Sequence, residues 1–168
     1  MVQLHALVDE LTAPLEAAHQ ERLVCRRGCA GCCVDGLTVF EVEADRLLRS
    51  VDLETLVEGP EGACALLDAN GACQAYLGRP YVCRTQGLPL RWGADGPRGP
   101  VEHRDICPLN DGDPPLESLA ADECWTLGPV EQRLALAQRK AQSTQGDDEQ
   151  VPLRRVALRD LVRAALDA

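Results

Sequence analysis

Apolar residues recur every three or four positions near the start of the chain. Five residues carry the pattern: Leu4, Leu7, Val8, Leu11 and Leu15. This spacing places their side chains on one face, so a helix is predicted over residues 2–20, with a bend at Pro14. We interpret it as a packing helix, on which His5 and His19 are packing or surface residues rather than metal ligands.

The pattern returns after residue 38 and then fades. It predicts a helix over about 41–50 and a short second helix after Asp52, which is a suitable N-cap. Gly59-Pro60 is expected to end that second helix.

Residues 60–110 are rich in Gly and Pro and hold only short apolar pieces. This composition predicts irregular loops that need metal crosslinks to become ordered. Asn70-Gly71 is a strong turn signal within them. The flanking segments 64–67 and 73–77 are expected to form at most a small hairpin.

Prolines divide the C-terminal part of the chain. Pro114-Pro115 marks a break, and Pro129 is predicted to begin a helix that runs to about Gln142. Pro152 is predicted to open a last helix. The polar, acidic residues 143–150 between these two helices are expected to be an exposed linker.

The composition supports a helical fold. The chain has 168 residues, enough for one domain with helical extensions, and only 3% of them are aromatic. Strands are usually richer in aromatic residues. The predicted fold class is mainly α: a small helical domain with a long irregular cysteine-rich, metal-stapled loop region and at most a short β-hairpin.

The charge balance excludes some partners. The formal net charge at pH 7 is −10, which argues against nucleic acid because a phosphate backbone needs a basic surface. No apolar run approaches the length of a membrane span, and acidic residues interrupt the first apolar positions, unlike a secretory signal. We therefore expect a cytoplasmic protein with no nucleic-acid or membrane contact, in which thiols stay reduced.

Nine cysteines dominate the chemistry. Four lie within residues 25–33 and five follow: Cys25, Cys29, Cys32, Cys33, Cys64, Cys73, Cys83, Cys107 and Cys124. Thiolates repel one another, so such crowding is typical of a soft metal ion or an iron–sulfur cluster. Cys29 and Cys32 have the two-residue gap of a chelating knuckle. Adjacent Cys32 and Cys33 are expected to serve two centres, or two metals in one centre, because neighbouring side chains diverge.

Eight of the nine cysteines would fill two four-thiolate sites. We expect Cys124 to be the spare thiol, packed near Trp125 and Leu127 as a small hydrophobic residue. The competing assignment makes Cys124 the eighth ligand and leaves Cys25 or Cys107 spare. His103 is an alternative ligand, although an exposed loop histidine is the simpler interpretation.

Three other interpretations use the same cysteines. Disulfides conflict with the odd cysteine count and the adjacent pair. A radical S-adenosylmethionine site matches the spacing of Cys25, Cys29 and Cys32, but Gly31 replaces the usual aromatic residue and the chain is short for the barrel. Cys107-Pro108 echoes a ferredoxin run, but the preceding cysteines are too scattered.

The other polar residues form no catalytic set. Arg26, Arg27 and Arg84 flank cysteines, where a guanidinium favours the thiolate, although Arg26 and Arg27 suit an exposed loop equally well. Three acidic residues in 41–45 are close enough in sequence to reach a metal, but an acidic helix start explains them more simply. Enzymatic activity is left open.

Several pieces of the sequence together resemble a known family. They are Cys29-Ala30-Gly31-Cys32-Cys33, Cys64, Gly71-Ala72-Cys73-Gln74-Ala75-Tyr76 and Arg79-Pro80-Tyr81-Val82-Cys83-Arg84, followed by Cys107 or Cys124. In this order they resemble the YkgJ-type cysteine-cluster proteins, whose CxxCxxCC domain is regarded as zinc- or iron-chelating. The resemblance covers about residues 25–125. Cys25 departs from it, because three residues rather than two separate it from Cys29.

The resemblance implies that cysteines hold the metal. The expected ligands are Cys25, Cys29, Cys32, Cys33, Cys64, Cys73, Cys83 and Cys107. A related cysteine-rich segment occurs in flagellin lysine methylases, which keeps an iron–sulfur enzyme among the alternatives.

The sequence thus predicts three units: an N-terminal helix in 1–24, a metal-binding domain in 25–125, and C-terminal helices packing on it in 126–168. The leading hypothesis is a cytosolic protein that holds zinc or iron in a structural or metal-handling role. The alternative is an iron–sulfur cluster enzyme or electron-transfer protein. A third is an interaction module in which metal only holds the loops together. Metal ions are the partners expected, and the sequence indicates no particular protein partner.

Overall fold

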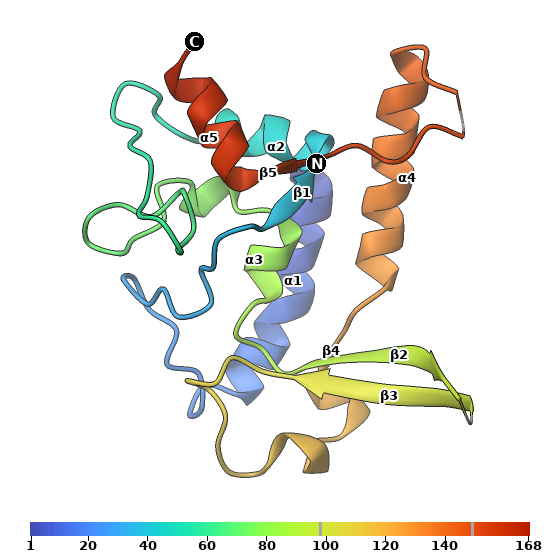
Figure 1. Ribbon diagram of the computed structural model, residues 1–168. Helices are drawn as coiled ribbons and strands as arrows, with labels where there is room; N and C mark the ends of the chain where they lie inside the picture. Colours follow the sequence, from blue (N-terminus) through green and yellow to red (C-terminus); the bar gives the residue numbers. More distant parts are fainter. Residues whose placement is uncertain (98, 149) are drawn as a thin grey trace.

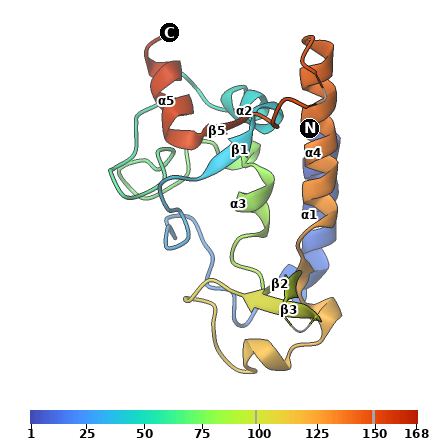
Figure 2. The same ribbon diagram turned by 45° about the vertical axis from the view of Figure 1, so that its right-hand side comes forward.

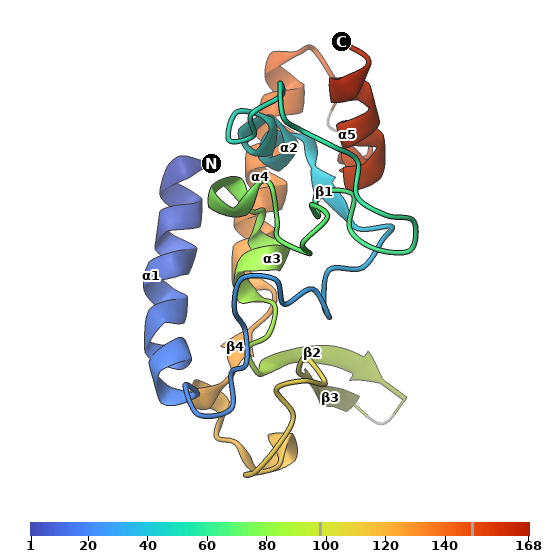
Figure 3. The same cartoon turned by 90° about the vertical axis from the view of Figure 1, so that its left-hand side faces the viewer.

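Two long helices span the molecule. The computed structural model describes residues 1–97, 99–148 and 150–168, so position 98 of the predicted loop-rich stretch and position 149 of the predicted linker lie outside the described residues. Helices α1 (Val2–Ala18) and α4 (Pro129–Thr144) stand upright in every view (Figure 1, Figure 2 and Figure 3). Smaller elements gather near one end and a β-hairpin lies at the other, with α3 (Tyr81–Thr85) between them (Figure 1).

The smaller elements near the top of Figure 1 join distant parts of the sequence. Strand β1 (Thr38–Phe40) pairs antiparallel with β5 (Arg155–Ala157), and Val39 lies opposite Val156. Helices α2 (Glu41–Leu48) and α5 (Leu158–Leu166) follow these two strands directly. Residues 49–75, all described, run beside this group as turns and isolated bridges without a helix or strand.

The second sheet has the strand order β3-β2-β4. Strand β2 (Leu90–Gly96) pairs antiparallel with β3 (Gly99–Asp105) and parallel with the short β4 (Trp125–Thr126). Three short 3₁₀ helices complete the elements: η1 (Tyr76–Gly78), η2 (Leu116–Ser118) and η3 (Ala121–Glu123).

The mainly α prediction is wrong. Helices account for 39% of the chain and strands for 16%, and the described residues form two sheets. The strands escaped prediction for physical reasons. Strand β3 is exposed at nearly every position, so it shows no alternation of buried and exposed residues. Strand β1 spans three residues and finds its partner near the other end of the chain, which leaves no local signal.

Three of the predicted helices lie where they were expected, and one short helix is absent. Helices α1, α2 and α4 lie where the apolar spacing indicates, and α4 begins at Pro129, where the Glu131 carboxylate accepts the Gly128 N–H. The short helix predicted directly after Asp52 is absent. A turn forms there instead, in which the Asp52 carboxylate accepts the Glu54 N–H.

The C-terminal boundaries also differ from the prediction. The last helix begins at Leu158 rather than at Pro152, because the preceding residues pair with β1. The predicted linker 143–150 starts inside α4, and its Asp147 forms an ion pair with Arg154. It therefore takes part in tertiary contacts instead of being a purely solvated connection.

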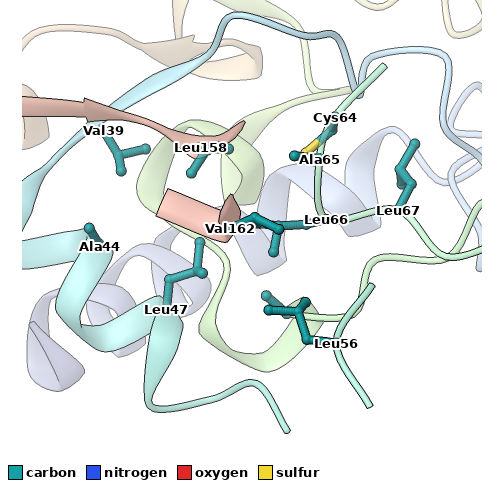
Figure 4. Close-up of a cluster of buried hydrophobic side chains, with 11 residues drawn as sticks. Val39, Ala44, Leu47, Leu56, Cys64, Ala65, Leu66, Leu67, Leu158 and Val162 are labelled. Atoms are coloured by element: carbon teal, nitrogen blue, oxygen red, sulfur yellow. The ribbon is translucent and has the colours of Figure 1, made fainter. Parts of the chain in front are cut away.

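Three apolar clusters hold the fold together. The largest joins α2, β1 and α5 to the loop residues Cys64, Ala65, Leu66 and Leu67 (Figure 4). The second joins α1, α3, β2 and α4 through Val8, Tyr81, Leu90 and Leu134, among others. The third contains Cys124 with Ile106, Leu116 and Leu119. None of the helices within the described residues has the length and apolar character needed to cross a membrane.

Candidate metal centre

The first cysteine cluster lies on two tight turns. The Cys29 N–H donates to the Arg26 carbonyl at 2.9 Å, and the Cys33 N–H donates to the Ala30 carbonyl at 3.0 Å. Gly28 has a φ of +84°, a conformation that L side chains rarely adopt, and so the first turn needs glycine. The first cysteine cluster therefore lies in a tight loop that depends on glycine.

Backbone hydrogen bonds join this cluster to Cys64. The Cys64 N–H donates to the Cys33 carbonyl at 2.9 Å, and Val34 forms an antiparallel bridge with Ala63. Two cysteines that are far apart in the sequence are therefore held on neighbouring chain segments.

Cys73 returns to the same region through the predicted turn. The Asp68 carboxylate accepts the N–H groups of Asn70 and Ala72, each at 2.8 Å. Leu67 then bridges Cys73. The turn prediction is confirmed, although its arms form one bridge rather than a hairpin of two strands.

Cys83 reaches the site from α3. This five-residue helix follows Pro80, and the Cys83 N–H donates to the Pro80 carbonyl at 3.0 Å. The loop-rich prediction for 60–110 did not include α3.

The electrostatics show that five of these thiols are neighbours. Burial, followed by the charges of Cys64, Cys73 and Cys32, raises the pKa of Cys83 to about 12. Burial also raises the pKa of Cys64 and, together with the charge of Cys64, that of Cys73. We call Cys32, Cys33, Cys64, Cys73 and Cys83 the five-thiol group.

The adjacent pair Cys32 and Cys33 shares one hydrogen bond. Their hydrogen bond lowers the pKa of Cys32 to about 6 and raises the pKa of Cys33, to which burial and the charges of Cys32, Cys64 and Cys83 add. Near neutral pH the pair thus holds one proton and one negative charge.

The donor set suits a soft metal, but the side chains do not converge. Thiolates are the ligands that zinc, iron and iron–sulfur clusters prefer. Across residues 1–97, 99–148 and 150–168, however, no three Cys, His, Asp or Glu side chains are arranged to hold one ion. The thiols lie in one neighbourhood and are donors of the type that these metals prefer. To coordinate one ion, their side chains would have to move closer together.

Cys25 is held by a residue that the sequence analysis did not single out. Buried Asn110 donates from Nδ2 to the Gly87 carbonyl at 2.8 Å and to Cys25 Sγ at 3.3 Å. Its Oδ1 accepts the Val24 N–H at 3.0 Å, and its own N–H donates to the Cys107 carbonyl at 2.7 Å. One amide therefore links the loops that carry Cys25 and Cys107. An isolated asparagine gives no signal for this in the sequence.

The remaining cysteines differ in exposure. Cys29 is half-buried and Cys107 is buried. Cys124 is buried in the third apolar cluster, with Ile106 and Leu116 among its neighbours.

Two other candidate metal ligands, one acidic residue and one histidine, contact structural partners. Glu43 is buried and accepts hydrogen bonds from His5 Nε2 and from the Tyr81 N–H, so it joins α1, α2 and α3. His103 lies on β3, where its ring stacks on Trp92 at 5.5 Å between centroids.

The arginines near the thiols are not all those expected. Arg84 is buried and pairs with Asp9 at 2.6 Å, while Arg26 and Arg27 are exposed. Arg79 and Arg159 act on the thiols instead. Burial raises the pKa of Cys73, Cys83 and Cys64, and the charge of Arg79 offsets part of this rise for the first two and that of Arg159 for Cys64. Arg79 stands in one of the resembling pieces, whereas Arg159 is distant in sequence from every cysteine.

The comparisons with known proteins agree with the cysteine pattern. Residues 24–96 match the CxxCxxCC family model, described as "Putative zinc- or iron-chelating domain". Cys107 and Cys124 lie beyond the matched residues. No curated protein and no solved structure matches the chain. The predicted resemblance is therefore confirmed as a match to the CxxCxxCC family model over residues 24–96.

Proposed function

We propose that this protein is a cytosolic metal-binding protein that holds zinc or iron through cysteine thiolates, in a structural or metal-handling role. The five-thiol group supports this proposal most strongly, because three loops and one short helix bring these cysteines into one neighbourhood. All nine cysteines are free thiols, as a reducing compartment would keep them.

The proposed ligands extend beyond this group. Cys32, Cys33, Cys64, Cys73 and Cys83 form the centre, and Cys29 adjoins it on the first cluster. Cys25 and Cys107 complete the set, since Asn110 links their loops. In this proposal residues 25–125 are the metal-binding unit, and 1–24 and 126–168 pack against it.

Anaerobic purification followed by elemental analysis and an absorption spectrum tests the proposal. Bound zinc gives a colourless protein, and iron is detected by its absorption. A purified protein that contains neither metal and takes up neither on addition would contradict the proposal.

An iron–sulfur enzyme or electron carrier is the second candidate. Five neighbouring thiols exceed the four that one tetrahedral zinc ion takes, which favours a polynuclear centre. A cluster gives a brown protein whose absorption is bleached by dithionite, so the same spectrum separates the two candidates.

Substitution of Cys83 is expected to lower the bound metal per chain. Cys83→Ser removes a half-buried thiol that has Cys64, Cys73 and Cys32 as charged neighbours, whereas Cys124→Ala removes a thiol from an apolar cluster. Elemental analysis should show a clear loss for the first variant and near-normal content for the second. Cys107→Ala should also lose metal. A normal metal content in Cys83→Ser would remove Cys83 from the ligand set. A loss of metal in Cys124→Ala would make Cys124 a ligand in place of Cys107.

Zinc binding is expected to release protons at pH 7. Thiols whose pKa is raised hold their protons in the metal-free protein, and a thiolate site must lose them. Cys32, with a pKa of about 6, is already ionised at this pH. A four-thiolate site that includes Cys32 should therefore release about three protons per ion, measured with an indicator in weak buffer. Affinity should rise with pH, and zinc binding without proton release would exclude these thiols as ligands.

A further inference from the structure

Arg159 on α5 makes an unusually complete set of contacts with the loops that carry the cysteines. Its Nε donates to the Asp35 carboxylate at 2.9 and 3.0 Å. One terminal nitrogen donates to Glu58 Oε1 at 2.6 Å and to the Gly59 carbonyl at 3.1 Å. The other donates to the carbonyls of Pro60 and Ala63, at 2.9 and 2.7 Å. All three guanidinium nitrogens are thus hydrogen-bonded.

These acceptors lie next to two members of the five-thiol group. Asp35 stands two residues after Cys33, and Ala63 immediately precedes Cys64. Residues 49–75 contain no helix or strand that would otherwise fix the second loop. The loop closes on itself through the Gly59 N–H, which donates to the Ala65 carbonyl at 2.8 Å. The Arg159 guanidinium binds carbonyl groups of the same loop.

The geometry needs arginine. The Arg159 side chain is only 13% exposed, and a planar fork with donors on three nitrogens matches a carboxylate on one side and loop carbonyls on the other. A lysine ammonium would supply the charge from a single point and could not reach both loops. The guanidinium charge also acts on Cys64, where it offsets part of the rise in pKa that burial causes.

We propose that Arg159 is a positioning residue for the metal centre: it clamps the Cys33–Asp35 segment to the Pro60–Cys64 segment, so that Cys33 and Cys64 are held together before metal binds. The metal part of this proposal rests on the proposed function. The clamp comes from outside the matched residues 24–96, and so the C-terminal helix is part of the working site.

Alkylation of the thiols in the metal-free protein tests the clamp without metal. Arg159→Met removes the fork and the charge but keeps much of the apolar length, and Arg159→Lys keeps only the charge. Arg163→Met is the matched control, because Arg163 also contacts Glu58 from α5 but, within the described residues, donates to neither the loop carbonyls nor Asp35. Peptide mass spectrometry then follows the labelling rate of each cysteine.

Arg159→Met should speed labelling of Cys33 and Cys64 roughly tenfold, with Arg159→Lys between this and wild type. Arg163→Met should stay within about twofold of wild type. Labelling of buried Cys124 should stay unchanged, because it lies in another cluster. Unchanged labelling of Cys33 and Cys64, or an equal acceleration at Cys124, would overturn the clamp. If Arg159→Met does not fold, Asp35→Asn must give the same selective pattern, and its failure to do so overturns the clamp equally.

Zinc affinity in the same variants tests the metal part. Competition with a chelator should show roughly tenfold weaker binding for Arg159→Met, the size of effect expected from residues that support metal ligands, and near-normal binding for Arg163→Met. Equal affinity in wild type and Arg159→Met would remove the role in metal binding. A wild-type protein that binds no metal contradicts the proposed function, and the alkylation result then still decides whether Arg159 clamps the loops.

Discussion

Removal of the metal is expected to lower the melting temperature by roughly 10 °C or to abolish cooperative unfolding. A ligand present at a thousand times its Kd stabilises the folded state by about 4 kcal/mol. In a chain of this size that corresponds to roughly 10 °C. The effect should be concentrated in residues 49–75, where neither helix nor strand supplies order and Cys64 and Cys73 would be crosslinked by the ion. Thermal unfolding monitored by circular dichroism, before and after chelation, measures it.

Readdition of the metal provides the control, since zinc or iron should restore the original melting temperature. Cys124→Ala should show the same drop and the same recovery as wild type. An unchanged melting temperature after elemental analysis has verified metal loss would contradict this prediction. It would mean that the apolar clusters order the loops unaided.

Glu43→Ala is expected to produce the largest loss of stability from a single substitution outside the cysteines. Glu43 is 4% exposed, and its carboxylate accepts His5 Nε2 at 3.1 Å and the Tyr81 N–H at 2.7 Å. Alanine leaves two buried donors without an acceptor, which costs roughly 3 kcal/mol or more. The melting temperature should fall by roughly 10 °C.

Two matched variants show whether the hydrogen bonds cause the loss. Glu43→Gln keeps an acceptor oxygen and should cost less than about half as much. Glu41→Ala, on the same helix, removes a carboxylate that is 41% exposed and paired with Arg154, so its effect should stay below about 1 kcal/mol. Similar losses in Glu43→Ala and Glu41→Ala would show that the buried hydrogen bonds are unimportant for stability.

Sequence reasoning succeeded where the information is local. The spacing of Leu4 to Leu15 determines α1, and Pro129 marks the start of α4. Asn70-Gly71 forms its turn because Gly71 has a φ of +72° and Asp68 caps the turn. The resemblance to the CxxCxxCC domain could be recognised for the same reason, since it rests on short runs of neighbouring residues.

The failures concern contacts between distant residues. Nothing near Thr38 indicates that it will pair with Ala157, and nothing near Arg159 indicates Asp35 or Ala63. Glu43 could be read as the acidic start of a helix because its partners, His5 and Tyr81, lie 38 positions away in each direction. The grouping of thiols is of this kind too, since chain segments that carry no cysteine help to hold them.

The pairing of β1 with β5 has a consequence for synthesis on the ribosome. Thr38 and Arg155 are 117 positions apart, with every cysteine of the later loops between them. At usual rates of elongation, β1 leaves the ribosome on the order of 10 s before its partner strand exists. During that interval the nascent loops have neither their neighbouring strand nor the guanidinium of α5. An ion captured by the growing chain would therefore meet loops that Arg159 has not yet joined.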